Sequence, residues 1–306
     1  MEILSIVFYL LLTLTLLQTL LSLARGSRTC QKLPPEPAML PVIGNILKLG
    51  HKPHESLADL TKIHGPIMSL KLGQLTTIVV SSSTMAKQIL QKQDLAFSTR
   101  SIPDSLHAHD HNHYSVAWLP VADRWRSLRK IMASNIFSGN RLDIPTAAEG
   151  GGVHFLRRKC SQEGVAVDIG RVAFTTSLNL LSNTVFSMDL ADPSLDSAKE
   201  FKDLVSNIME EAGKPNLVDY FPVLEKIDPQ GIRGQRKVHF AKILQLFGRL
   251  IDERLELRKL RKTSEENDVL DILLDIIEQN SEDIDRIHME HLFLVCLSSP
   301  PCSSRI

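Results

Sequence analysis

The chain has 306 residues, of which 43% are hydrophobic and 23% charged, and its formal net charge at pH 7 is zero. A chain of this length can bury a sizeable core, as one large domain or as two. Because no excess of positive charge is present to attract phosphate, the composition argues against a nucleic-acid-binding protein. The four cysteines have no regular spacing, so a disulfide framework is not expected. They are Cys30, Cys160, Cys296 and Cys302.

The first segment is apolar and long enough to cross a membrane. No charged residue occurs from Ile3 to Ala24, and as a helix this run would span roughly 30 Å, the thickness of a hydrocarbon core. Basic residues follow the run, at Arg25, Arg28 and Lys32, and none precedes it. This asymmetry predicts an uncleaved transmembrane anchor over residues 1–24, with the following residues in the cytosol.

A proline-rich stretch then separates this segment from the body of the chain. Prolines stand at positions 34, 35, 37 and 41. They cannot continue a helix and they favour an extended, stiff spacer, so residues 25–45 are predicted to form a hinge.

The period of the apolar residues changes soon after the hinge. Apolar residues at helical spacing predict a helix that ends at Gly65. Two alternating runs, Ile67–Leu72 and Leu75–Val80, predict a hairpin with its turn at Gly73–Gln74. Ser82 and Ser83 are the residues expected to cap the helix that follows.

The residues Asp123 to Lys130 have the most distinctive chemistry. Asp123 is predicted to cap a helix that continues to Phe137, and on that helix Trp125 and Arg129 share one face. An indole N–H beside a guanidinium suits a carboxylate or a phosphate, because the guanidinium can donate two parallel hydrogen bonds. A packed tryptophan with a solvated arginine is the alternative interpretation.

The stretch from Ser101 to Trp118 has no helical or strand period, and every second residue in its middle is a histidine. These are His107, His109, His111 and His113. On a strand they would all point one way and could hold zinc or copper. No cysteine or carboxylate cluster other than Asp110 lies nearby, so no metal site is expected.

Residues 144–159 contain Pro145 and three consecutive glycines, which rule out a regular helix. A glycine-rich phosphate loop is also disfavoured, because the Lys-Ser/Thr signature is missing and no strand precedes the stretch.

The remaining chain is predicted to be mostly helical. A largely apolar helix spans Ala173–Phe186, and Lys199–Glu211 is amphipathic. Phe221–Leu224 is an apolar tip that either contacts lipid or packs in the core. Phe240–Leu260 forms a long helix and another begins near Asn267. The apolar side of the amphipathic helix contains Phe201, Leu204, Val205 and Ile208.

Several of these stretches point to one family. They are the Trp-x-x-x-Arg helix and the runs His64–Gly73, Leu90–Ser98 and Glu211–Asp219. Together with the proline-rich hinge they resemble the N-terminal half of a plant microsomal cytochrome P-450, a haem-thiolate monooxygenase. The likeness covers Met1 to Leu294 apart from residues 144–159. It implies a mainly α fold with a small β-hairpin, in which residues 46–294 form part of the haem-monooxygenase domain behind a single transmembrane helix.

The resemblance also implies roles for particular residues. Trp125 and Arg129 would bind a haem propionate, and the substrate cavity would lie under the 101–118 loop and the 199–211 helix. The lining candidates are Ile102, Leu106, Trp118, Asn207, Ile208 and Ala212.

The implied cofactor is haem, and the implied partners are membrane lipid, an NADPH-dependent cytochrome reductase and a lipophilic substrate. The expected place is the endoplasmic reticulum membrane, single-pass, with the catalytic side in the cytosol. Within the family the likeness indicates hydroxylation of a monoterpenol such as geraniol, and a flavonoid or another terpenoid is the alternative substrate.

The end of the chain departs from the family pattern. After Leu294 the sequence reads Val-Cys-Leu-Ser-Ser-Pro-Pro, where the family continues Asp-Leu-Phe-Val-Ala-Gly. A one-base deletion explains the change, so residues 295–306 are interpreted as an off-pattern tail. A compensated pair of frameshifts would similarly explain residues 144–159.

The family's loop for the iron ligand, Phe-x-x-Gly-x-Arg-x-Cys-x-Gly, is absent, and none of the four cysteines has its surroundings. The thiolate is needed for the family's chemistry, so we expect the chain to be inactive as given. It is then either an incomplete record of a monooxygenase or a non-catalytic, membrane-anchored fragment.

Overall fold

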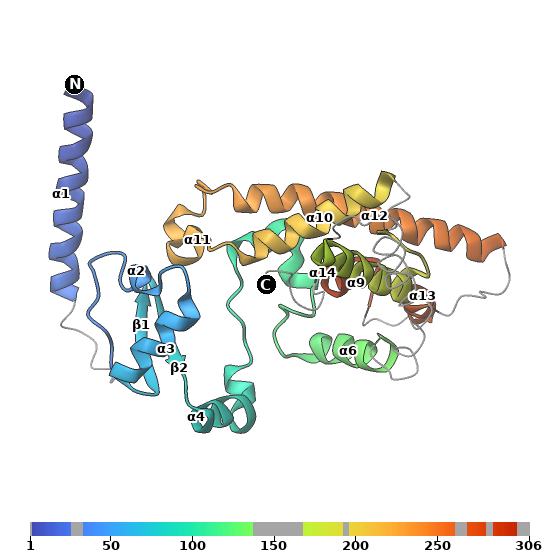
Figure 1. Ribbon diagram of the computed structural model, residues 1–306, viewed down its shortest axis with the longest axis horizontal. Coiled ribbons are helices and arrows are strands. Elements are labelled where there is room, and N and C mark those ends of the chain that lie inside the picture. The colour runs from blue at the N-terminus through green and yellow to red at the C-terminus, as the bar shows by residue number, and fades with distance from the viewer. Residues whose placement is uncertain are drawn as a thin grey trace. The chain divides into compact units, whose positions relative to one another are not determined.

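A computed structural model of the chain describes residues 2–25, 33–136, 168–191, 196–260, 268–279 and 284–298. The chain divides into two compact units, one of residues 1–97 and 217–229 and the other of residues 98–216 and 230–306. The predicted fold class, mainly helical with one small two-stranded sheet, is confirmed (Figure 1). The off-pattern stretch 144–159 lies outside the described residues.

The first unit combines short helices with the hairpin. Its elements are α1 (Glu2–Arg25), α2 (Ile46–Leu49), α3 (Pro53–His64), β1 (Ile67–Leu72), β2 (Leu75–Val80), α4 (Ser83–Lys87), η1 (Gln88–Lys92), η2 (Asp94–Phe97), α11 (Leu217–Tyr220) and η5 (Pro222–Leu224). The side chains of α1 are described from Ser5 to Thr19. Within the described part of the chain, no helix is both long and apolar enough to span a membrane.

The hairpin forms as predicted. β1 and β2 are antiparallel, with Met68 opposite Val79 and Leu70 opposite Thr77, and Gly73–Gln74 connect them. Side chains alternate between the two faces of a strand, so Met68 and Leu70 lie together on the buried face, where α3 covers them. This small core holds the first unit together.

The proline-rich segment covers the other edge of β1. The amide of Ser69 donates to the carbonyl of Pro35 (3.0 Å), and its hydroxyl donates to the carbonyl of Pro34 (2.9 Å). Gly44 lies against the same strand with a φ of +63°, and a Cβ on it would stand 2.0 Å from the carbonyl oxygen of Lys71. Only glycine fits this close approach of two backbone segments.

Of the two serines predicted to cap α4, Ser82 does so, since its hydroxyl accepts a hydrogen bond from the amide of Met85 (3.2 Å), and Ser83 is the first residue of the helix.

The second unit contains the long helices. Its elements are η3 (Asp104–Asp110), α5 (His111–Tyr114), α6 (Asp123–Ile131), η4 (Met132–Ile136), α9 (Ile169–Phe186), α10 (Asp196–Gly213), α12 (Ile232–Leu260), α13 (Val269–Glu278) and α14 (Arg286–Ser298). Three phenylalanines from α9, α12 and α14 meet at its centre. The ring of Phe186 lies 5.8 Å from that of Phe247 and 4.9 Å from that of Phe293, and none of the three is more than 1% exposed. Buried rings at these separations supply a large part of core stability.

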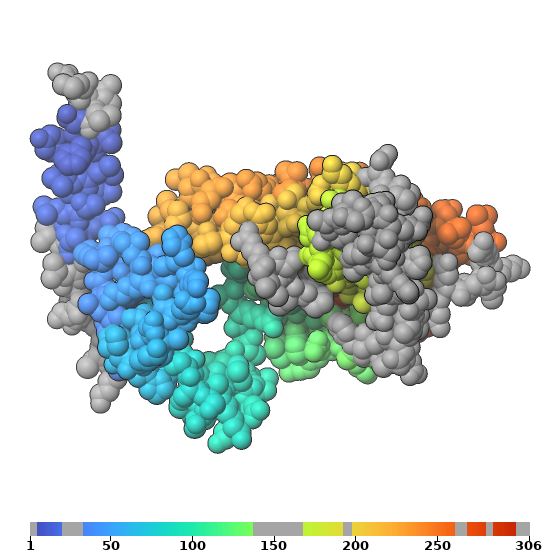
Figure 2. Space-filling view, viewed as in Figure 1, coloured from blue at the N-terminus to red at the C-terminus, as the bar shows by residue number. Residues whose placement is uncertain are grey.

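The amphipathic pattern of α10 is confirmed. Its four predicted apolar residues are buried, with exposures between 1% and 7%, and they face α12 and the core. In Figure 2 the outer side chains of α10 and α12, yellow and orange, form one continuous surface. The apolar side of α10 therefore packs against α12.

Two local predictions in this unit are wrong. The 101–118 stretch is not irregular, because η3 and α5 occupy most of it. Asp123 does not cap α6: the helix begins one residue earlier than predicted, with Ala122 at the N-cap, and Asp123 in the first turn pairs with Arg126 at 2.9 Å.

Candidate functional site

Trp125 and Arg129 lie on α6, as the sequence predicted, but their environments differ. Trp125 is half-buried against the core, and its indole N–H donates to the carbonyl of Val116 at 3.1 Å. Arg129 is exposed and forms no hydrogen bond or ion pair with the described residues. Of the two side chains predicted to donate hydrogen bonds to an anion, Arg129 is the one that the described structure leaves accessible.

The six predicted lining residues fall into two groups. Leu106 and Ile208 belong to the hydrophobic core of the second unit, and Trp118 packs against that core as a partly buried residue. Leu106 is 6% exposed and Ile208 is 3% exposed, so both contribute to the core. The others, Ile102, Asn207 and Ala212, are exposed. The structure thus places three of the six in or against the core and leaves three at the surface.

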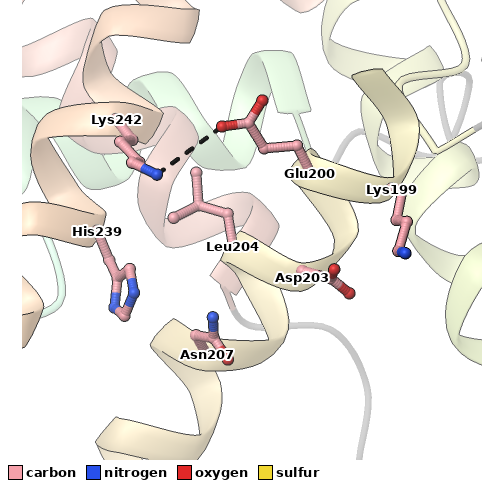
Figure 3. A pocket seen from close by; sticks show the side chains of 7 residues that line it. All are labelled: Lys199, Glu200, Asp203, Leu204, Asn207, His239 and Lys242. Atoms are coloured by element: carbon pink, nitrogen blue, oxygen red, sulfur yellow. Dashed lines mark ion pairs between the residues drawn. The ribbon is translucent and has the colours of Figure 1, made fainter. Parts of the chain in front are cut away.

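Asn207 lines a polar depression of about 350 Å³ between α10 and α12 (Figure 3). Lys242 reaches across it to Glu200, with 3.9 Å between Nζ and Oε1. The other lining residues are Lys199, Asp203, Leu204 and His239. Asn207 is the one polar lining residue that was predicted from the sequence. The depression joins residues of two helices that lie more than 30 positions apart in the chain, and no local sequence pattern shows that such residues are neighbours.

A buried carboxylate lies beside this depression. Glu211, 4% exposed, accepts a hydrogen bond from Nδ1 of His239 at 2.6 Å, and Nε of Arg236 stands 3.6 Å from its other oxygen. Burial lowers the pKa of Arg236, and the charge of Glu211 opposes that shift. Glu211 on α10 is thus linked to Arg236 and His239 on α12, so the two helices are joined by charge as well as by packing.

The four alternating histidines do not share one direction. His107, His109 and His113 are exposed, whereas His111 is buried and its Nδ1 lies 2.7 Å from Nδ1 of His291. Loss of hydration lowers the pKa of His111 to about 3 and that of His291 to about 4. Both rings are therefore neutral at pH 7. Among the described residues no group of three histidines, cysteines or carboxylates is placed to hold a metal ion.

Cys296 is the cysteine that the structure describes. It lies on α14 against the core, and burial raises the pKa of its thiol to about 12. The group stays protonated at neutral pH, so it does not provide a thiolate. Cys30, Cys160 and Cys302 lie outside the described residues.

The described residues therefore fit only one edge of a haem group. Arg129 suits a propionate, since a guanidinium can donate two parallel bonds to a carboxylate. The indole of Trp125 is already paired with Val116, and Cys296 packs against the hydrophobic core.

A mainly helical body, a small hairpin near the N-terminus and the Trp-x-x-x-Arg helix agree with the haem-monooxygenase class that the sequence resembles. The chain belongs to the cytochrome P450 family, because the family model matches residues 34–298. This confirms the resemblance inferred from the sequence, and haem is the cofactor of that family.

Two plant enzymes are highly similar to the chain. It is 60% identical over 297 residues to geraniol 8-hydroxylase of Catharanthus roseus and 59% identical over 296 residues to that of Swertia mussotii. It is also 48% identical over 290 residues to 7-ethoxycoumarin O-deethylase of Helianthus tuberosus. The first two alignments include 96% of this chain and 59% of each relative's length. The third includes 94% of this chain and 58% of the relative's length. The chain thus spans less than two thirds of the relatives' length.

Proposed function

We propose that this chain is the N-terminal part of a haem-thiolate monooxygenase that inserts one atom of O₂ into a lipophilic alcohol, with geraniol as the first candidate. The 60% identity to a geraniol 8-hydroxylase over nearly the whole chain is the observation that supports this most strongly. A flavonoid or another terpenoid is the alternative substrate. Electrons would come from an NADPH-dependent cytochrome reductase. Haem bound through a thiolate supplies the oxygen activation in this family.

The residues of this chain would bind the haem group and orient the substrate. Arg129 would hold one propionate by two parallel hydrogen bonds. Leu106, Trp118 and Ile208 would present apolar surface to the substrate, and Asn207 at the edge of α10 could hydrogen-bond a hydroxyl group. The support for this assignment is the family membership, together with the exposed positions of Arg129 and Asn207.

We also propose that the uncharged run Ile3–Ala24 anchors the protein in the endoplasmic reticulum membrane with its body in the cytosol. The support is the sequence: the length of the run and the basic residues that follow it. In the first unit the tip residue Val223 is 75% exposed, so a lipid surface could reach it.

The 306-residue chain would not hydroxylate by itself. The thiol of Cys296 remains protonated, and the other cysteines lack the phenylalanine and glycines of the family's ligand loop. The second candidate function, a membrane-anchored fragment without catalysis, is favoured by the same observation.

A chimera tests the proposal. Residues 1–294 of this chain are joined to the remaining part of the Catharanthus roseus relative, and the product is reconstituted with reductase, NADPH and O₂. We expect a thiolate-type spectrum with carbon monoxide and conversion of geraniol. A correct spectrum without geraniol conversion would reject the substrate and keep the reaction class. A folded chimera without bound haem would reject both.

A further inference from the structure

The buried residues of α12 form a row along one face of the helix, and charged residues occupy two places in that row. A buried residue occurs at every third or fourth position, the spacing of a seam between packed helices. The row consists of Ile232, Arg236, Phe240, Ile243, Phe247, Ile251 and Arg254. Arg236, which is 3% exposed, therefore stands where the pattern calls for an apolar side chain.

α10 has a matching row with one charged member. Phe201, Leu204 and Ile208 are buried at every third or fourth position, and the next residue in the series is Glu211, which is 4% exposed. An apolar row on each helix is thus interrupted once near the same end of the contact, by a carboxylate on α10 and by Arg236 on α12.

The two helices run antiparallel. Glu200, near the start of α10, faces Lys242, whereas Glu211, near the end of α10, faces Arg236, which comes earlier in α12 (Figure 3). The pair of Glu200 and Lys242 is exposed and loose, with 3.9 Å between Nζ and Oε1. The pair inside the seam is the one that is shielded from water.

The buried pair is incompletely bonded. Nε of Arg236 stands 3.6 Å from Oε2 of Glu211, and in the described part of the chain neither atom has a hydrogen-bond partner. Nη2 of Arg236 reaches the carbonyl of Ile208 only at 3.4 Å. Taking two charges out of water costs several kcal/mol, and attraction at this geometry repays little of it. Stability is therefore a poor explanation for two charges at this place.

Alignment of the helices is a better explanation. Apolar attraction has no direction, so a slide of α10 along α12 by one turn, about 5.4 Å, would again set apolar side chains against apolar ones. The same slide would set Glu211 against Phe240 or Ile232, according to its direction, and would take Arg236 away from its carboxylate. A polar residue in an apolar seam selects one register in this way, at a cost in stability.

We propose that Glu211 and Arg236 are positioning residues that fix the register of α10 on α12. Asn207 and Ile208, which the proposed function assigns to the substrate, lie one turn before Glu211 on the same helix, so the pair also sets their positions along α12. The register itself does not rest on the proposed function, because it depends on contacts within the second unit.

The register can be measured as the distance between two spin labels on the complete 306-residue chain. The labels are attached to cysteines at Ser206 on α10 and Glu253 on α12, two exposed positions, and the four native cysteines are replaced by alanine. Since the two sites are offset along the helix axes, a slide by one turn changes their separation by roughly 5 Å. Pulsed electron double resonance resolves such a change.

The decisive variant combines Glu211→Met with Arg236→Met. No buried charge is left unpaired, so this protein should be at least as stable towards urea as the labelled parent. We expect a single distance in the parent and a second maximum, roughly 5 Å away, in the double variant. The matched control combines Glu200→Gln with Lys242→Met, which removes an exposed pair between the same two helices, and it should keep the single distance.

Three results would overturn the proposal. A single unchanged distance in the double variant would show that the apolar rows fix the register without the charged pair. A broad distribution without a second maximum would indicate loosened packing and no alternative register. Loss of the folded state in the double variant would make the pair a source of stability. The geraniol assay of the chimera does not enter this measurement, so failure of the proposed substrate and failure of the register are told apart.

Discussion

His111 and His291 share one hydrogen bond between their Nδ1 atoms, 2.7 Å apart, although both rings are buried. One ring must donate and the other accept, so at least one of them is neutral. Tyr114 stacks on His291 with 5.3 Å between ring centroids, and the ring of Phe240 meets His111 edge-on at 5.1 Å. This cluster joins α5, α12 and α14, and its burial favours the neutral form of both imidazole rings.

Acid should destabilise the second unit through this pair. Unfolded histidines take up protons below about pH 6.5, whereas the folded rings do so only near pH 3 and 4. Between these values the unfolded state binds more protons, so stability that is fully present above pH 6.5 is lost as the pH falls. By pH 5 the loss should be about 2 kcal/mol for each histidine. Urea unfolding at pH 7.5 and pH 5.0 measures it.

A matched pair of variants isolates the effect. His111→Gln combined with His291→Gln keeps a donor and an acceptor at the contact and removes the titration, so the difference between the two pH values should shrink. His113→Gln, on an exposed ring of the same element, should behave like the parent chain. A parent chain equally stable at both pH values would contradict the neutral pair.

The His pair also shows what a sequence alone can predict. The hairpin and the apolar face of α10 follow from periodicity within a few residues, and both were predicted correctly. His111 and His291 are 180 positions apart, and only the packing of α5 on α14 brings them together. The pairing of Trp125 with Val116 was missed for a related reason, because the 101–118 stretch was interpreted as irregular. Periodicity assigned Ile208 to the apolar face of its helix, but it could not distinguish core packing from a cavity wall.

A second prediction concerns the ion pairs between α12 and α13. Arg254 bonds Asp271 at 2.6 Å and Asp268 at 2.9 Å, and both carboxylates are buried. Removing Arg254 takes from the buried Asp268 the guanidinium that pairs with it, whereas Asp271 keeps Arg258 at 2.9 Å, so Arg254→Met should lower the free energy of unfolding by about 3 kcal/mol. Lys259→Met, which breaks an exposed pair with Glu256 on the same helix, should change it by less than about 0.5 kcal/mol. Chemical denaturation of the three proteins provides the comparison.

A third prediction tests the N-terminal segment. Deletion of residues 1–24 should release most of the expressed chain from a membrane pellet after a high-salt wash, because the apolar run would supply the insertion energy. The measurement is the fraction of unaggregated protein in the supernatant. If the shortened protein stays in the pellet, the anchor proposal loses its support, and Val223→Asp then shows whether the exposed tip binds lipid.

The last prediction concerns haem ligation by the chain as it stands. Arg129 offers charge-assisted hydrogen bonds to a carboxylate, which contribute only about 1.5 to 3 kcal/mol each, whereas iron needs a thiolate to give the family's chemistry. Cys296 packs against the apolar core, where burial raises the pKa of its thiol to about 12, and the sequence around it lacks the phenylalanine and glycines of the family's ligand loop. We therefore expect no thiolate-type band when the purified 306-residue protein is reduced and exposed to carbon monoxide, and no NADPH-dependent hydroxylation of geraniol. Cys296→Ser should leave the spectrum of added hemin unchanged. A clear thiolate-type band from the parent chain that disappears in Cys296→Ser would show that α14 opens to expose this sulfur, and would reject the assignment of Cys296 as a buried core residue.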